Sequence, residues 1–109
     1  MKVGNVLDYR GGGRFVVIDI QNDEHASGGY SGAKFTLTKD GSECLHVCNS
    51  TGDEGPLLMV EERVLAPEDI FKLIMLGSAH GQHNTHQWIP SLEELEEAIN
   101  KPGIMVTLG

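Results

Sequence analysis

Three histidines at intervals of three residues, His80, His83 and His86, have the side chains and spacing that best fit a metal site. They lie in the stretch 77–90, which shows no clear helix or strand pattern. Neutral imidazoles are common zinc ligands, and three of them can hold one ion with a coordination position left open. The glycine, asparagine and threonine between them weaken a helix, and the cluster contains no carboxylate to act as a general base. We therefore predict a polar loop whose histidines bond to backbone groups or contact a partner, and zinc binding is a third hypothesis.

Cys44, His46 and Cys48 alternate along a predicted strand and so project from one face of it. Sulfur and imidazole suit zinc or copper, but structural zinc sites usually place two cysteines across a tight turn. Four residues of strand span roughly 13 Å, whereas a disulfide needs α-carbons within about 7 Å. We expect reduced thiols that pack in the core, in keeping with a reducing compartment.

A glycine cluster flanked by arginines, from Arg10 through Gly12 to Arg14, offers a concave set of N–H donors for an anion. It joins strand to strand, so no helix directs its dipole at a phosphate, and a plain hairpin turn is the simpler interpretation. If the chain binds a small anionic, nucleotide-like molecule, we expect the contacts to come from this turn together with Tyr30 and His83.

Acidic residues dominate the second half of the chain. The net charge is −8, and residues 53–109 carry ten acids against three bases. Direct nucleic-acid binding is disfavoured, because affinity for phosphates comes largely from Lys and Arg. A basic surface on another protein is a suitable partner, although acidic runs are usually solvated helix faces. The residues predicted to contact such a partner are Glu61, Glu62, Trp88, Glu93, Glu94, Glu96 and Glu97.

The elements that must position these residues indicate one α+β domain over residues 1–109. Strands are predicted near 3–9, 15–20, 34–38, 43–48 and 57–65, as an antiparallel β-meander or small curled barrel, with a short C-terminal strand at 104–108. One helix is expected from Pro67 to a glycine cap at Gly77, and a second from a capping box formed by Ser91 and Glu94. Both helices are expected to pack on one side of the sheet.

These patterns favour a small acidic intracellular binding protein that acts by occlusion, of the kind that phages encode against nucleic-acid-processing or defence complexes. The alternative is a ligand-binding module or sponge for a small anionic molecule. We expect no enzyme activity, cofactor or membrane association, since no catalytic carboxylate pair, triad or apolar span is present in the sequence. A cytoplasmic location follows, and an exposed edge strand would allow a homodimer.

Overall fold

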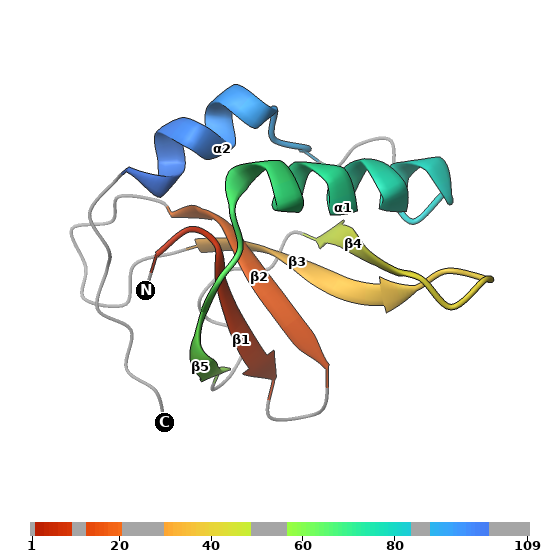
Figure 1. Ribbon diagram of the computed structural model, residues 1–109, viewed down its shortest axis with the longest axis horizontal. Coiled ribbons are helices and arrows are strands. Elements are labelled where there is room, and N and C mark those ends of the chain that lie inside the picture. The colour runs from red at the N-terminus through yellow and green to blue at the C-terminus, as the bar shows by residue number, and fades with distance from the viewer. Residues whose placement is uncertain (1, 10–12, 21–29, 49–56, 84–87, 101–109) are drawn as a thin grey trace.

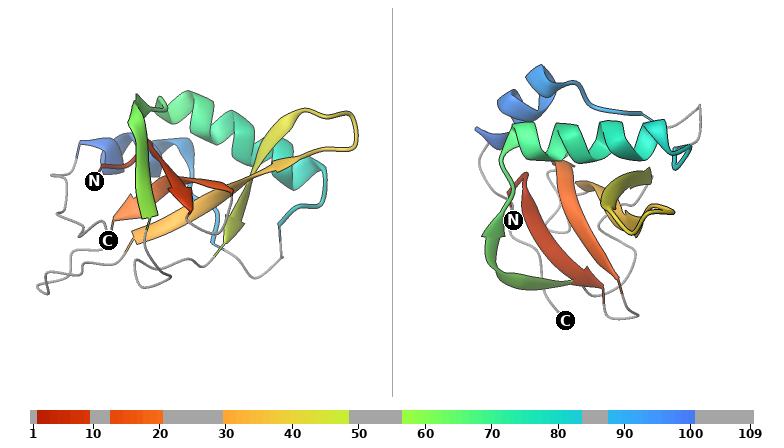
Figure 2. Two further views of the ribbon diagram at one scale, coloured as in Figure 1. Left: turned by 90° about the horizontal axis from the view of Figure 1, so that it is seen from below. Right: turned by 45° about the vertical axis from the view of Figure 1, so that its right-hand side comes forward.

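The computed structural model describes residues 2–9, 13–20, 30–48, 57–83 and 88–100. Five strands form one antiparallel sheet in the order β4-β3-β2-β1-β5, and two helices lie together on one side of it (Figures 1 and 2). The elements are β1 (Asn5–Tyr9), β2 (Arg14–Ile20), β3 (Tyr30–Leu37), β4 (Glu43–Cys48), β5 (Leu57–Val64), α1 (Pro67–Ala79) and α2 (Leu92–Ile99). The predicted α+β fold with an antiparallel sheet and two helices is confirmed, and the sheet is not closed.

The first four strands form a meander, whereas β5 returns to the opposite edge and pairs with β1. Gly4 makes this return compact: its carbonyl accepts the Leu65 N–H at 2.8 Å, and its N–H donates to Val17 at 2.8 Å. Its φ of +94° and the closeness of the Leu65 carbonyl leave no room for a β-carbon. The predicted closing strand at 104–108 lies outside the described residues.

The middle strand, β2, is buried on both faces, as its unbroken apolar run from Phe15 to Ile18 predicts. Register shifts interrupt its pairing with β3 and the pairing of β1 with β5. Such irregularities bend and twist strands, which accounts for the curl of the open sheet. In the described part of the chain, neither helix combines the length and apolar character needed to cross a bilayer.

Each helix buries one narrow apolar stripe against the sheet. Ile70 and Ile74 of α1 are four residues apart, and Leu95 and Ala98 of α2 are three apart, so each pair lies on one helical face. α1 packs mainly on β4, and α2 packs on α1 and β2. The start signals act as predicted: Pro67 begins α1, and Ser91 forms a capping box at α2.

The sequence predicts Gly77 as the C-terminal cap of α1, and this prediction is wrong. Gly77 is buried inside the last turn, and α1 ends at Ala79 with His80 as the C-cap. A β-carbon at Gly77 would collide with the backbone carbonyl of Leu45 on β4. The glycine therefore allows the helix to approach the edge strand, and Gly81, with a φ of +71°, takes the left-handed conformation after the helix.

Candidate functional site

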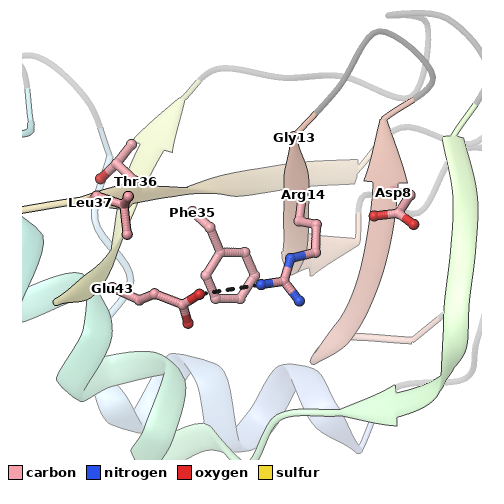
Figure 3. Close-up of a pocket in the computed structure, with 7 residues that line it drawn as sticks. All are labelled: Asp8, Gly13, Arg14, Phe35, Thr36, Leu37 and Glu43. Atoms are coloured by element: carbon pink, nitrogen blue, oxygen red, sulfur yellow. Dashed lines mark hydrogen bonds and ion pairs between the residues drawn. The ribbon is translucent and has the colours of Figure 1, made fainter. Parts of the chain in front are cut away.

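An open cleft of about 520 Å³ lies at one end of the helix-facing side of the sheet (Figure 3). Its lining comes from four consecutive strands of the meander: Asp8, Gly13, Arg14, Phe35, Thr36, Leu37 and Glu43. Directly paired residues of antiparallel strands share a face. Asp8 pairs with Arg14, and Leu37 pairs with Glu43. Val16 pairs with Ala33, and these lie an even number of residues from Arg14 and from Leu37, so both pairs occupy the same side of the sheet.

Two residues further along the strands, the same face of the sheet is buried. The row formed there by Val6, Val16, Ala33 and Val47 has at most 2% of each residue exposed. The cleft is therefore the end of a face whose other half is part of the buried core. Hydrophobic burial beneath the helices fixes the floor from which the cleft residues project.

Arg14 organises the centre of the cleft. Its guanidinium lies 3.2 Å from Glu43 Oε1, and its Cζ atom lies 5.2 Å from the centre of the Phe35 ring. The two charged side chains keep 36% and 49% of their surfaces exposed, so solvent screens the pair and it contributes about 1 kcal/mol or less to stability. Its main effect is to hold Arg14 across the ring of Phe35, toward β4 and away from Asp8.

A rigid turn carries the outer wall of the cleft. The N–H of Thr38 donates to the Ser42 carbonyl at 2.8 Å, and the N–H of Ser42 donates to Asp40 Oδ1 at 3.0 Å. The Thr38 hydroxyl donates to the same carboxylate. These bonds, the Thr38 side chain first and then the Ser42 backbone, lower the pKa of Asp40 to about 2. At the base of the turn, Leu37 is 67% exposed.

His83 lies at a second place on the fold, where it joins the end of α1 to the edge of β4. The N–H of Val47 donates to His83 Nδ1 at 3.1 Å, and Nε2 lies 2.9 Å from the Ile74 carbonyl. Because the Ile74 carbonyl only accepts and the Val47 N–H only donates, Nε2 is the donor and Nδ1 is the acceptor. Both ring nitrogens are engaged with backbone groups, as expected for a loop histidine with a structural role.

His46 stacks on His83 with ring centroids 5.6 Å apart and planes inclined by 15°. Within the described residues, its buried Nδ1 has no hydrogen-bond partner. Burial lowers the pKa of His46, and the nearby His83 and Lys34 lower it further. The two stacked rings lie between β4 and the end of α1.

The predicted metal ligands that the structure describes do not form a metal site. His80 is exposed at the C-cap of α1, His83 uses both nitrogens, and His86 lies outside the described residues. Cys44 is a buried free thiol whose sulfur lies 3.1 Å from the Thr36 hydroxyl. Within the ranges the structure describes, no group of three His, Cys, Asp or Glu residues is placed to hold a metal.

The predicted anion ligands are also separated. Arg14 contacts β4 at Glu43, whereas His83 contacts it at Val47, and four residues of strand correspond to roughly 13 Å. Arg10, Gly12 and the side chain of Tyr30 lie outside the described part of the structure.

The acidic face predicted for partner binding is exposed on α2. Glu93, Glu94, Glu96 and Glu97 are all exposed, and Glu94 also serves the capping box by accepting from the Ser91 N–H at 3.3 Å. The single ion pair within the described residues is that of Arg14, so these acids have no basic partner there. Trp88, just before α2, is 43% exposed, and the side chains of Glu61 and Glu62 are outside the description.

Asp8, Phe35, Leu37 and Glu43 line the cleft but were not predicted as site residues from the sequence. The alternation of Phe35 and Leu37 marks them as sharing one face, but only the strand register places that face beside Arg14. Comparison of the chain with protein-family models, with curated proteins and with solved structures returned no match.

Proposed function

We propose that this chain is a binding domain that occludes a basic surface on another protein. The observation that supports the proposal is the uncompensated charge of the helical layer. The two helices carry six acids and one base, Lys72, and neither helix has a basic residue in its last turn. Four of these acids lie in first turns, where the helix dipole favours them, whereas Glu96 and Glu97 lie beyond the first turn of α2 and are exposed.

The electrostatics favour a partner rich in Lys and Arg. With a net charge of −8, the domain attracts basic surfaces and repels acidic ones, which raises association rates and selects partners. A surface that binds nucleic acid is rich in Lys and Arg, because it must neutralise phosphates. We therefore propose as targets the nucleic-acid-processing or defence complexes expected from the sequence.

The proposal includes no catalytic step. A general base needs a free ring nitrogen or carboxylate aimed at a substrate. Both nitrogens of His83 are bound to the backbone, and the unpartnered Nδ1 of His46 is buried within the described residues. In the cleft, Arg14 is paired with Glu43. For the location we propose the cytoplasm, supported by the free thiol of Cys44, because reducing compartments keep thiols unpaired.

A small anionic ligand is the second candidate, and the cleft supports it through Arg14 and Gly13. The cleft volume lies within the range of small-molecule sites. Two carboxylates, Asp8 and Glu43, stand beside the single guanidinium, however, and this balance favours cations. We rank protein binding first for this reason. Native mass spectrometry of the protein from its host tests for a retained anion.

Affinity capture tests the proposed function. The wild-type protein and a variant with Glu93→Gln, Glu96→Gln and Glu97→Gln are immobilised and exposed to nuclease-treated extract of the host cell. We expect a stoichiometric basic protein on the wild type, strongly reduced on the variant and competed by added duplex DNA. Asp19→Asn, which removes a charge from β2, serves as the control. Equal capture of every protein by all three baits would contradict the proposal.

A further inference from the structure

The cleft beside Arg14 combines an exposed apolar surface with carboxylates at both ends. We propose that it receives a short segment of the basic partner protein, with an apolar side chain against Leu37 and Phe35 and a Lys or Arg side chain at Asp8. This inference rests on the proposed function and names the place where the partner's anchor binds.

Leu37 supplies exposed apolar surface to the cleft. It is 67% exposed although it sits on a strand whose face is otherwise core. Phe35, two residues earlier on the same face, is partly buried and packs on that core. A side chain laid across both would remove apolar surface from water without any rearrangement of the sheet.

The position of Arg14 determines which end of the cleft can receive a cation. Its guanidinium is held by Glu43 and by the ring of Phe35, toward one end of the cleft. Figure 3 shows Asp8 on the other side of Arg14, away from Glu43. Within the described residues Asp8 has no ion pair, and the cleft carries two carboxylates against one guanidinium. A cation is therefore the complementary group at the Asp8 end.

The cleft is already organised before a partner binds. The turn that carries Leu37 is held by hydrogen bonds among Thr38, Asp40 and Ser42, and Arg14 lies against Glu43 and the Phe35 ring in a weaker, partly exposed contact. Groups that are ordered beforehand lose little conformational entropy on binding. A segment of only a few residues is thus sufficient to gain measurable affinity.

Peptides of defined sequence test the inference without knowledge of the partner. The isotope-labelled protein is titrated with acetyl-Leu-Lys-Leu-Lys-amide and followed by amide NMR shifts. The acidic peptide acetyl-Leu-Glu-Leu-Glu-amide and the polar peptide acetyl-Ser-Lys-Ser-Lys-amide are titrated in parallel. We expect the basic apolar peptide to bind most tightly and to shift residues 13–14, 35–37 and 43.

Variants then separate the two halves of the cleft. Leu37→Ser is expected to weaken binding about tenfold at every salt concentration, because it removes apolar contact. Asp8→Asn is expected to weaken it about threefold at low salt and less at high salt. Val64→Ser, which alters an exposed apolar residue of β5, and Asp19→Asn are matched controls that should bind as the wild type does. Unchanged thermal unfolding establishes that each variant is folded.

The outcomes distinguish the inference from the proposed function. If the peptide shifts only amide resonances of the helices, or if the basic and acidic peptides bind equally well, the cleft is not the binding site. In that case the captured protein would still depend on Glu93, Glu96 and Glu97. If the peptide binds in the cleft but the variant with Glu93→Gln, Glu96→Gln and Glu97→Gln captures the partner as well as the wild type does, the cleft site stands. The proposed binding surface on the helices is then wrong.

Discussion

His83 accepts a hydrogen bond from the backbone N–H of Val47, 36 positions earlier in the chain, across a distance of 3.1 Å. The donor lies on β4, an edge strand of the described sheet. Unpaired N–H groups on edge strands invite pairing with other chains. The imidazole satisfies one of these groups, while Gly77 brings α1 against the neighbouring carbonyl of Leu45. Side chain and helix together protect this edge.

Replacing His83 tests how much this bridge contributes. His83→Ala leaves the Val47 N–H without its acceptor, and loss of a partner for a buried donor costs about 1–3 kcal/mol. We expect urea denaturation to show a loss of that size, with faster hydrogen exchange at the Val47 amide. His80→Ala, three residues away and exposed, is the control and should leave both measurements near the wild-type values. Equal losses in both variants would refute the assignment.

The stacked pair of His46 and His83 makes stability depend on pH. Burial first, then His83 and Lys34, lower the pKa of His46 in the folded state. The unfolded chain therefore binds a proton at His46 near its ordinary pKa of about 6.5, whereas the folded chain binds it only at lower pH. This contribution is fully present above about pH 6.5 and is lost as pH falls toward the folded pKa.

His46→Phe keeps a stacking ring and removes the titration. We expect the wild type to lose more unfolding free energy than this variant when the pH is lowered from about 8 to about 5. Chemical denaturation at a series of pH values measures the difference. Parallel curves for the two proteins would show that His46 contributes no pH dependence.

Gly77 gives a prediction that opposes helix propensity. Alanine is about 1 kcal/mol better than glycine inside a helix, but the new methyl group would press on the carbonyl of Leu45. Overpacking of this kind costs about 1–3 kcal/mol, so we expect Gly77→Ala to lower the melting temperature. Ser78→Ala, exposed in the same turn, is expected to be neutral or slightly stabilising. A Gly77→Ala variant more stable than the wild type would contradict the close packing of α1 on β4.

The turn between β3 and β4 contains a carboxyl group, that of Asp40, whose pKa can be measured directly. Hydrogen bonds, chiefly from the Thr38 side chain, lower the pKa of Asp40 to about 2. Their contribution to stability is present above the ordinary carboxyl pKa of 3.8 and is lost as pH falls toward 2. We expect Thr38→Val to move the Asp40 carbon resonance titration toward its ordinary range. A carboxyl that titrates identically in both proteins would show that Thr38 does not hold it.

Local chemistry was sufficient to predict much of the fold. The turn at Asp40 and Gly41, the proline start of α1 and the capping box at Ser91 depend on residues within a few positions of each other. Such signals can be recognised within short stretches of sequence. The buried run of β2 likewise identifies a central strand without reference to its neighbours.

Contacts between distant segments were the part that sequence could not give. In the sequence Gly77 looks like a helix cap, and only the structure shows that β4 passes beside it. His83 likewise looks like a metal ligand, and only the structure shows that its two ring nitrogens contact the backbone of Val47 and Ile74. The cleft depends on the register that brings Arg14 against Phe35. Each of these facts requires the three-dimensional pairing of strands and helices.

The salt dependence of partner binding tests the central claim most directly. The dissociation constant of the captured protein is measured at several salt concentrations, for the wild type and for the variant with Glu93→Gln, Glu96→Gln and Glu97→Gln. If the acids of α2 drive binding, affinity for the wild type falls steeply as salt rises, and the variant binds more weakly with a shallower dependence. The same affinity and the same salt dependence in both proteins would contradict the role assigned to the helical layer.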